Sequence, residues 1–319
     1  MARPDPTKVR RVACVGTGLM GGGWVAHFLA RGMDVVAQDP DPKAKEKLDR
    51  VLDAAWPPLT ELGLAPGASR DRVRLVTSVA EAVKDAEFVQ ESAPERRDLK
   101  IKLLAEIDRH APPEIVIASS TSGFVMSSMY GECARKERLV VGHPFNPPYL
   151  MPLVEVCGGE KTAKDVVDWT CRFYEHNGHY ALKMTKEVEG FLANRLQQVL
   201  WHECLMMVRD GLATPEQLEA ALRYGPGLRW AMMGHFTLQH MAGGEGGIRH
   251  NIDHFGLPEG GGYSYLKAPG YTPALKAEVI AACDEITQGK SYQELAKARD
   301  KNLVAFLKAL RANKDWPTS

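Results

Sequence analysis

Two titratable residues twelve positions apart, His143 and Glu155, lie in the segment VVGHPFNPPYLMPLVEV at 140–156. An imidazole exchanges a proton near neutral pH, and a carboxylate behind the ring would fix its tautomer and stabilise the imidazolium. His143 follows the apolar run RLVVG, and Glu155 lies in the apolar run after the prolines. A chain reversal between the runs predicts a proton-transfer pair, although a structural histidine beside a loop fits the same residues.

A glycine-rich turn near the N-terminus has the spacing G-x-G-x-x-G within RVACVGTGLMGGGWVAHFLARG. An apolar strand at 12–15 precedes the turn, and a helical pattern at 24–30 follows it. In this context the first two glycines allow a tight turn and close approach to a pyrophosphate, and the third allows the helix to pack on the strand. The predicted cofactor-binding residues of the turn are Gly16, Gly18, Leu19, Met20 and Gly21.

An acidic residue ends the second predicted strand, because the run MDVVAQD closes with Asp39. A carboxylate at this place accepts hydrogen bonds from the ribose hydroxyls and repels a 2′-phosphate, which favours NAD over NADP. No Arg follows Asp39 before Arg50, although Lys43 and Lys45 lie nearby. The predicted cofactor is therefore NAD.

Apolar runs alternate with helical patterns through the first half of the chain. Such alternation predicts an α/β fold with a doubly wound, mostly parallel sheet. Ligands of open parallel sheets bind at the carboxyl ends of the strands, so we expect His143, at the end of RLVVG, to lie beside the cofactor.

After about Lys186 the pattern becomes helical, beginning with KEVEGFLANRLQQVLWHECLMMVRDGLAT. Thr214 and Ser291 are expected N-caps, and 256–273 is a loop-rich insert. The expected domains are an NAD-binding domain at 1–186 and an all-helical domain for substrate binding and dimerisation at 187–319.

The composition excludes several classes of protein. The chain has 319 residues, with 40 acidic and 40 basic side chains, so no net field favours nucleic acid or anionic lipid. No apolar run reaches the roughly 18 residues of a membrane span, and the first ten residues lack the pattern of a signal peptide. Six scattered cysteines without C-x-x-C predict buried, reduced thiols of a cytoplasmic protein.

Five blocks resemble the 3-hydroxyacyl-CoA dehydrogenase superfamily: VGTGLMGGGWVAHFLARGMDVVAQDPDP, VQESAPERRDLK, IASSTSG, GHPFNPPYLMPLVEV and EVEGFLANRLQ. They are spread over most of the chain. The resemblance implies a Rossmann-type domain followed by a helical dimerisation domain, and hence a homodimer. It also implies that Glu95 and Lys100 line the nicotinamide ribose.

The same resemblance assigns the catalytic residues. It implies that His143 transfers the proton and that Glu155 orients the ring. It implies substrate hydrogen bonds from Ser122, near the reacting oxygen, and from Asn194, near the neighbouring carbonyl or carboxylate.

Further blocks resemble one branch of this family, the L-carnitine 3-dehydrogenases: AAWPPLTELGLAPGASRDRVRLV, GPGLRWAMMGHF, MAGGEGGIRHNIDHFG and SYQELAKARDKNLV. This resemblance implies NAD-dependent oxidation of the 3-hydroxyl of L-carnitine to 3-dehydrocarnitine. Residues 51–69 contain no Lys or Arg, whereas a site for the phosphates of coenzyme A would offer cations. The sequence therefore favours a small substrate without coenzyme A.

L-Carnitine carries a trimethylammonium group, which donates no N–H hydrogen bond and is recognised by aromatic faces. Its carboxylate would suit an arginine, and either Arg229 or Arg223 could bind it. Aromatic residues at these spacings are also typical of a core, and some carnitine enzymes carry Asp where this chain has Asn194. The predicted substrate residues are Trp201, Tyr224, Arg229, Trp230 and Phe236.

Three other functions remain open on the sequence: oxidation of another small 3-hydroxy acid such as L-gulonate, oxidation of a short-chain 3-hydroxyacyl-CoA, and NAD binding without turnover. His250 and His254, four positions apart, suit a metal on one helix face, but no third ligand at suitable spacing accompanies them. We interpret this pair as a solvated face and expect no metal.

Overall fold

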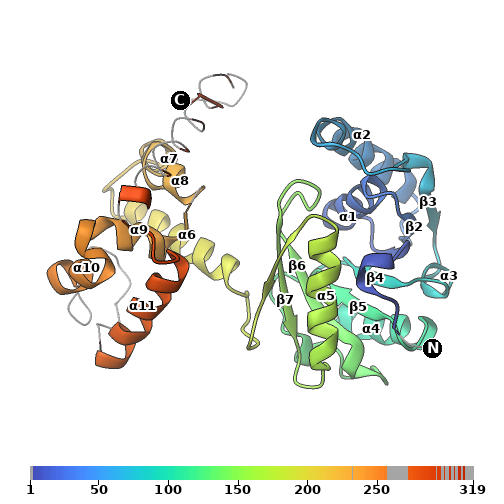
Figure 1. The fold of residues 1–319 in the computed structure, drawn as a ribbon. Coiled ribbons are helices and arrows are strands. Elements are labelled where there is room, and N and C mark those ends of the chain that lie inside the picture. Colours follow the sequence, from blue (N-terminus) through green and yellow to red (C-terminus); the bar gives the residue numbers. More distant parts are fainter. Residues whose placement is uncertain are drawn as a thin grey trace. The chain divides into compact units, whose positions relative to one another are not determined.

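The computed structural model describes residues 3–231, 233–256 and 272–291, and also 293–295, 298, 302, 305, 308–309 and 312. The chain divides into two compact units, 1–196 and 197–319, which are described separately (Figure 1). The insert expected at 256–273 lies almost wholly outside the described residues, as does most of the helix expected after Ser291.

The first unit is built on one eight-stranded sheet with the strand order β3-β2-β1-β4-β5-β6-β7-β8. All neighbouring strands pair in parallel except β6 and β7, which are antiparallel. The prediction of a doubly wound, mostly parallel sheet is therefore confirmed. The strands are β1 (Arg11–Val15), β2 (Asp34–Gln38), β3 (Val73–Val76), β4 (Phe88–Glu91), β5 (Val116–Ser119), β6 (Leu139–Pro144), β7 (Leu153–Gly158) and β8 (Tyr180–Lys183).

Helices cover both faces of this sheet, because successive strand residues point to opposite sides. Val12 and Cys14 of β1 belong to the core under α1, α2 and α5, whereas Ala13 and Val15 belong to the core under α3 and α4. The apolar strands are buried on both faces, as a parallel sheet requires. The helices are α1 (Leu19–Ala30), α2 (Ala44–Leu62), α3 (Val79–Val83), α4 (Arg97–His110) and α5 (Lys164–His176).

The elements described in the second unit are helical. Thr214 forms the expected capping box with Gln217, and Ser291 accepts a hydrogen bond from the Glu294 amide at 3.3 Å. Ile248, Ile252 and Ile280 form its small core with Cys283. Its helices are α6 (Ala193–Arg209), which starts in the first unit, α7 (Pro215–Tyr224), α8 (Pro226–Trp230), α9 (His235–Ala242), α10 (Gly247–Phe255) and α11 (Pro273–Ile286).

One helix start differs from the sequence expectation. The helical pattern begins near Lys186, but α6 begins at Ala193. Gly190 and Phe191 have φ values of +75° and +50°, which a right-handed helix does not allow. The preceding residues form a loop that contacts the loop after β5, where the Gly190 amide donates to the Gly123 carbonyl at 3.1 Å.

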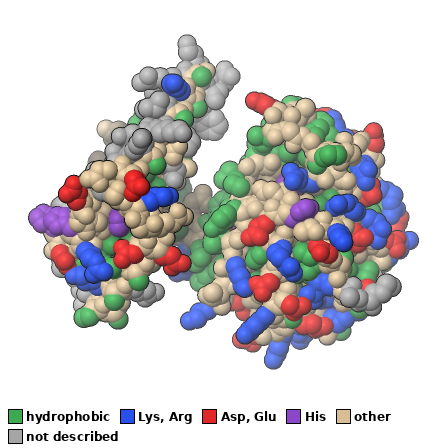
Figure 2. Space-filling view, viewed as in Figure 1, with side chains coloured by type: hydrophobic (Ala, Val, Ile, Leu, Met, Phe, Trp, Pro, Cys, Tyr) green, Lys and Arg blue, Asp and Glu red, His purple; other side chains and the backbone are tan. Residues whose placement is uncertain are grey.

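The cysteines and the surface charges agree with the expectations from the composition. All six cysteines are free, and five of them are buried. Figure 2 shows Lys and Arg side chains mixed with Asp and Glu side chains, without a large area of one sign in this view. In the part of the chain that the structure describes, no helix combines the length and apolar character that a membrane crossing needs.

Candidate active site

The glycine turn lies between β1 and α1, at the carboxyl edge of the sheet. Gly16 has a φ of +89°, and a Cβ at this position would lie 2.8 Å from the carbonyl oxygen of Ser92. A Cβ at Gly21 would lie 1.8 Å from the Gly16 oxygen, so a side chain cannot fit while the helix packs here. A Cβ at Gly18 would meet no atom within 4 Å, which leaves room for a ligand against the turn.

The N-terminus of α1 offers hydrogen-bond donors at the same place. Gly18 is the N-cap and provides no side-chain acceptor for the first helical amides, which begin at Leu19 and Met20. Helix N-terminal amides have no partner within the helix and bind phosphate well. The turn and the helix start therefore have the geometry of a pyrophosphate site.

Asp39 follows β2 and lies beside the glycine turn. One carboxylate oxygen accepts from the amide and the hydroxyl of Thr17, both at 2.9 Å. The other oxygen accepts from the Asp41 amide at 2.9 Å. The half-buried carboxylate is held in place by these bonds, where an adenosine ribose would need an acceptor.

His143 and Glu155 lie directly opposite each other on β6 and β7. The ring Nδ1 is 2.8 Å from Glu155 Oε2, and the two side chains are 6% and 0% exposed. A carboxylate only accepts hydrogen bonds, so Nδ1 carries the ring proton and Nε2 is left as a proton acceptor. The rings of Phe145 and Phe191 lie 5.4 and 5.1 Å from the imidazole, centroid to centroid.

Glu155 also accepts hydrogen bonds from backbone amides at the start of α6. Its Oε1 accepts from the amides of Leu192 at 2.8 Å and Ala193 at 3.0 Å. Burial alone would raise the pKa of Glu155, but the hydrogen bonds from His143, Ala193 and Leu192 outweigh burial, and the pKa is lowered. The carboxylate is therefore ionised at neutral pH, as a partner of an imidazolium must be.

A loop after β5 brings Ser122 and Asn194 together. The Oε1 atom of Glu95 accepts from the Thr121 hydroxyl at 2.6 Å and from the amides of Ser122 and Gly123 at 3.0 Å. Asn194 on α6 donates to the Ser122 carbonyl at 3.0 Å. Because Asn194 follows the amide that Glu155 binds, the loop and the His143–Glu155 pair share the start of α6.

Lys100 lies beneath this loop. Its ammonium is buried, with the side chain 1% exposed, and it lies 2.8 Å from Glu91 Oε1 and 3.6 Å from Glu95 Oε2. It also donates to the Ala93 carbonyl at 3.1 Å. Lys100 thus supports Glu95, whose side chain is 37% exposed. That both residues line the nicotinamide ribose, as the family resemblance implies, stays a prediction.

Two family models together match residues 11–188, as the NAD-binding domain of 3-hydroxyacyl-CoA dehydrogenase, and residues 190–267, as its C-terminal domain. The chain belongs to the 3-hydroxyacyl-CoA dehydrogenase family. Residues 11–188, which include the glycine turn, are therefore the NAD-binding domain of this family, and the chain is an NAD-dependent oxidoreductase.

Among curated relatives within the family, L-carnitine dehydrogenase of Streptomyces coelicolor is 54% identical over 305 residues, which cover 96% of each chain. L-Carnitine dehydrogenase of Pseudomonas aeruginosa is 47% identical and covers 97% of this chain and 96% of its own.

Among solved structures, 5-formyl-3-hydroxy-2-methylpyridine 4-carboxylic acid 5-dehydrogenase, an NAD+-dependent dismutase, has a TM-score of 0.72 at 29% identity. The match covers 96% of this chain and 100% of that one. The 3-hydroxybutyryl-CoA dehydrogenase of Escherichia coli K12 has a TM-score of 0.63 at 27% identity, covering 78% and 53%.

The residues predicted to contact substrate in this family member lie on the second unit. The side chains of the four aromatic residues are 39–59% exposed, and that of Arg229 is also exposed. They are therefore not core residues of the chain as described, and their contact with substrate stays a prediction. They are Trp201 on α6, Tyr224 on α7, Arg229 and Trp230 on α8, and Phe236 on α9.

The sequence did not predict the loop before α6, whose last residues bring two backbone amides to the Glu155 carboxylate. Phe191 is fully buried against the imidazole, and its positive φ places the next two amides on the carboxylate. The signal was the Gly-Phe pair at 190–191, because glycine before a helical pattern marks a non-helical turn. The helical pattern from about Lys186 includes this pair, although α6 begins only at Ala193.

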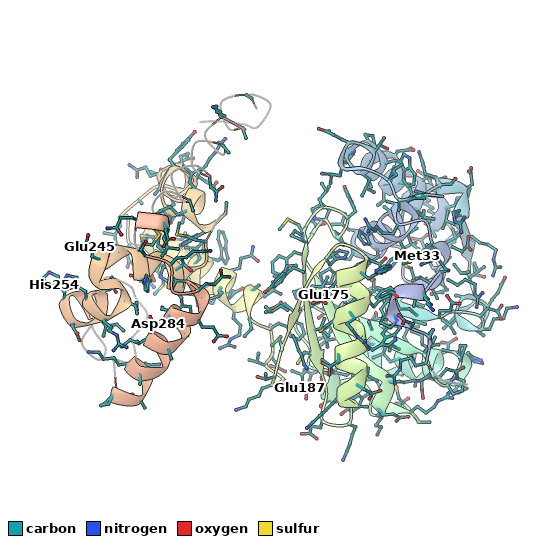
Figure 3. All side chains as sticks on the ribbon, viewed as in Figure 1. Met33, Glu175, Glu187, Glu245, His254 and Asp284 are labelled. Carbon is teal, nitrogen blue, oxygen red and sulfur yellow. The ribbon has the colours of Figure 1, made fainter. Side chains whose placement is uncertain are left out.

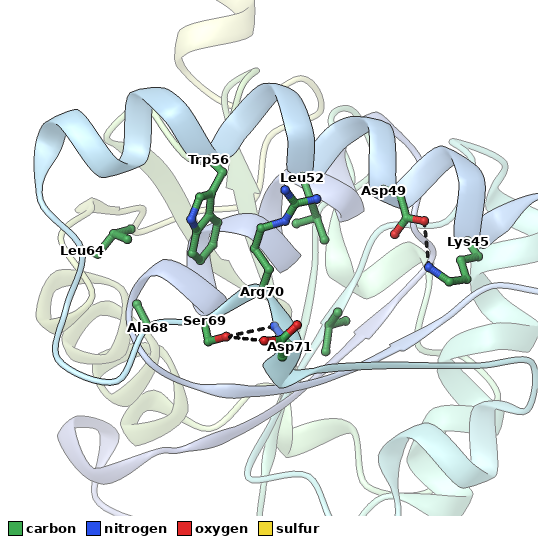
Figure 4. A pocket seen from close by; sticks show the side chains of 10 residues that line it. Lys45, Asp49, Leu52, Trp56, Leu64, Ala68, Ser69, Arg70 and Asp71 are labelled. Carbon is green, nitrogen blue, oxygen red and sulfur yellow. Dashed lines mark hydrogen bonds and ion pairs between the residues drawn. The ribbon is translucent and has the colours of Figure 1, made fainter.

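A separate pocket of about 760 Å³ lies between α2 and the start of β3 (Figure 4). Trp56 on α2 and Arg70 form part of its lining, and Arg70 pairs with Asp53 at 2.6 Å. None of the predicted site residues lines this pocket.

Proposed function

We propose that the chain oxidises the 3-hydroxyl of L-carnitine to 3-dehydrocarnitine with NAD. The observation that carries the chemistry is the buried His143–Glu155 pair, with Nδ1 and Oε2 2.8 Å apart. The observation that favours L-carnitine is the 54% identity to a curated L-carnitine dehydrogenase over 96% of each chain.

His143 acts as the general base. Its Nδ1 is bonded to Glu155, so Nε2 takes the proton of the substrate hydroxyl as the carbonyl forms. Bound NAD supplies the acceptor for the hydride that leaves C3. Glu155 stabilises the imidazolium, and the amides of α6 keep this carboxylate from turning away.

Ser122 and Asn194 hold the substrate. The Ser122 backbone is bonded on both sides, its amide to Glu95 and its carbonyl to Asn194. These bonds fix the backbone from which the hydroxyl extends. A hydroxyl on a fixed backbone can orient the reacting oxygen with a smaller entropic cost than one on a free loop.

The substrate is small. Residues 51–69, which form the second half of α2 and the start of the loop after it, carry no Lys or Arg that could bind the phosphates of coenzyme A. The exposed aromatic side chains of the second unit are available to a trimethylammonium group, with Arg229 or Arg223 for the carboxylate.

The test is NADH formation with L-carnitine, D-carnitine, L-gulonate and 3-hydroxybutyryl-CoA in parallel. We expect turnover with L-carnitine that exceeds the others and is lost in His143→Ala. Preference for L-gulonate or the acyl-CoA would reject the substrate, and full activity of His143→Ala would reject the base.

A homodimer in the cytoplasm completes the proposal. None of the residues of α6 is buried, and Val199, Trp201, Leu205 and Val208 are apolar side chains exposed on it. Such a surface is typical of a protein–protein interface. Light scattering of the purified chain should give twice the monomer mass of 35.2 kDa. The proposed cytoplasmic location rests on the six free thiols, which suit a reducing compartment.

A further inference from the structure

A small cavity of about 180 Å³ lies on the side of the sheet that α1 and α2 cover. It is bounded by the ends of these helices, by residues 148–152 and by the turn at 177–179. These segments belong to the first unit. Apolar side chains such as Leu59, Leu62 and Met151 form part of the wall.

Two buried histidines meet at this cavity. His27 and His179 are each 7% exposed, and their ring centroids are 4.1 Å apart. His27 Nε2 and His179 Nδ1 have no hydrogen-bond partner among the described residues. The other nitrogen of His179 bonds the Pro148 carbonyl at 3.0 Å, so it carries the proton and Nδ1 is an acceptor in the neutral ring.

The surroundings of the pair are positive. Arg31 is exposed and lines the cavity, and in the described part of the chain its guanidinium has no hydrogen bond or ion pair. A Cβ built on Gly178 would lie 3.8 Å from an Arg31 nitrogen, which places the guanidinium beside the turn that carries His179. No Asp or Glu lines the cavity.

Both imidazoles are neutral at neutral pH. Burial, together with the neighbouring His179 and Arg31, holds the pKa of His27 well below its usual range. Burial lowers the pKa of His179 to about 4. Buried polar atoms without partners cost free energy, so this pair of neutral rings lowers the stability of the fold at the cavity.

We propose that this cavity binds a small aliphatic carboxylate, at a site separate from the His143–Glu155 pair. The carboxylate accepts from the Arg31 guanidinium beside the two imidazole rings that line the cavity, and its short chain packs against Leu59 and Leu62. An anion favours the charged form of a histidine, so binding takes up a proton at His179 Nδ1. Arg31, the two histidines and Tyr149 are the titratable groups that line the cavity.

The site adjoins the loop that joins the two catalytic strands. Pro148 lies between β6, which carries His143, and β7, which carries Glu155. A Cβ at Gly23 would lie 2.7 Å from the Pro148 ring, so this part of the loop is packed closely on α1. An occupant would therefore contact a segment that is fixed relative to the active site.

The test is calorimetric titration of the full chain with sodium butyrate at pH 6 and pH 8, against sodium chloride at equal ionic strength. We expect one site per chain that binds at least threefold more tightly at pH 6, with net proton uptake. Arg31→Gln should weaken binding about tenfold or more. Arg109→Gln, at an exposed arginine of α4, is the matched control and should not.

His179→Gln tests the proton. It keeps a donor for the Pro148 carbonyl but cannot gain charge, so binding should remain and its pH dependence should disappear. Absence of butyrate binding, or binding unchanged in Arg31→Gln, would overturn the proposed site. Unchanged pH dependence in His179→Gln would overturn the role of the imidazole. Neither result depends on turnover, so the proposed dehydrogenase function is tested separately.

Discussion

Replacing Glu155 by Gln removes the negative charge behind the catalytic imidazole while keeping the shape of the side chain. The carbonyl of Gln can still accept from the amides of Leu192 and Ala193, which now bond Oε1 at 2.8 and 3.0 Å. Its NH₂ group would face His143 Nδ1, 2.8 Å from the present Oε2. The ring would then carry its proton on Nε2, the atom that must accept one.

The expected loss follows from the charges. At an effective dielectric constant of about 20, unit charges ~4 Å apart attract by ~4 kcal/mol, and this attraction forms only when His143 becomes an imidazolium. Each 1.36 kcal/mol changes a rate tenfold, so kcat should fall by about 10³. The KM for substrate should change much less, because neither residue leaves its place.

The assay is steady-state NADH formation across pH, with Glu187→Gln as the matched control. Glu187, labelled in Figure 3, also bonds a backbone amide, that of Ser127 at 2.9 Å, and its other carboxylate oxygen accepts from the Ser127 hydroxyl. Among the described residues, no imidazole bonds it. We expect near wild-type kcat for the control. A Glu155→Gln enzyme with more than a third of wild-type kcat, or with an unchanged pH profile, would refute the reasoning.

Stability should change with pH as well. The folded-state pKa of Glu155 is lowered from 4.5, mainly because hydrogen bonds outweigh burial. A carboxyl with a depressed pKa stabilises the fold above its unfolded pKa and loses this effect as the pH falls through the folded value. The difference in unfolding free energy between wild type and Glu155→Gln should therefore shrink below about pH 4.5.

Four further substitutions test the cofactor site and the packing of the first unit. Gly21→Ala should destabilise the fold and abolish NAD binding, since its methyl group would lie 1.8 Å from the Gly16 carbonyl oxygen. Gly18→Ala should fold normally and only weaken NAD binding, because its methyl group meets no atom within 4 Å. Thermal unfolding measures the stability of both variants, and calorimetry measures their NAD binding. Asp39→Asn should raise the KM for NAD about tenfold and reduce the preference over NADP, since it loses a charge-assisted bond to the ribose; equal KM values would contradict this role. Asp108→Asn should lower the free energy of unfolding by about 3–5 kcal/mol in urea titrations, because it leaves the buried Arg138, now 2.7 Å from Asp108, without its counter-charge.

Local patterns in the sequence predicted the first unit well. The glycine spacing at 16–21 predicted a turn between strand and helix because only glycine tolerates the backbone of Gly16 and the contact at Gly21. Alternating apolar and helical patterns predicted the doubly wound sheet, since each pattern has the period of its element. In the second unit, Thr214 and Gln217 form the expected capping box, because its hydrogen bonds join residues only three positions apart.

The tertiary structure decided which atoms meet. The sequence alone determined that a His and a Glu follow two apolar runs, but the antiparallel register of β6 and β7 made them opposite neighbours. Only the fold showed that Glu155 also binds the amides of α6, that Lys100 is buried under Glu95, and that α6 starts at Ala193. Periodicity is a property of neighbouring residues and can be read from the chain, whereas hydrogen bonds between distant residues depend on packing that no local pattern encodes.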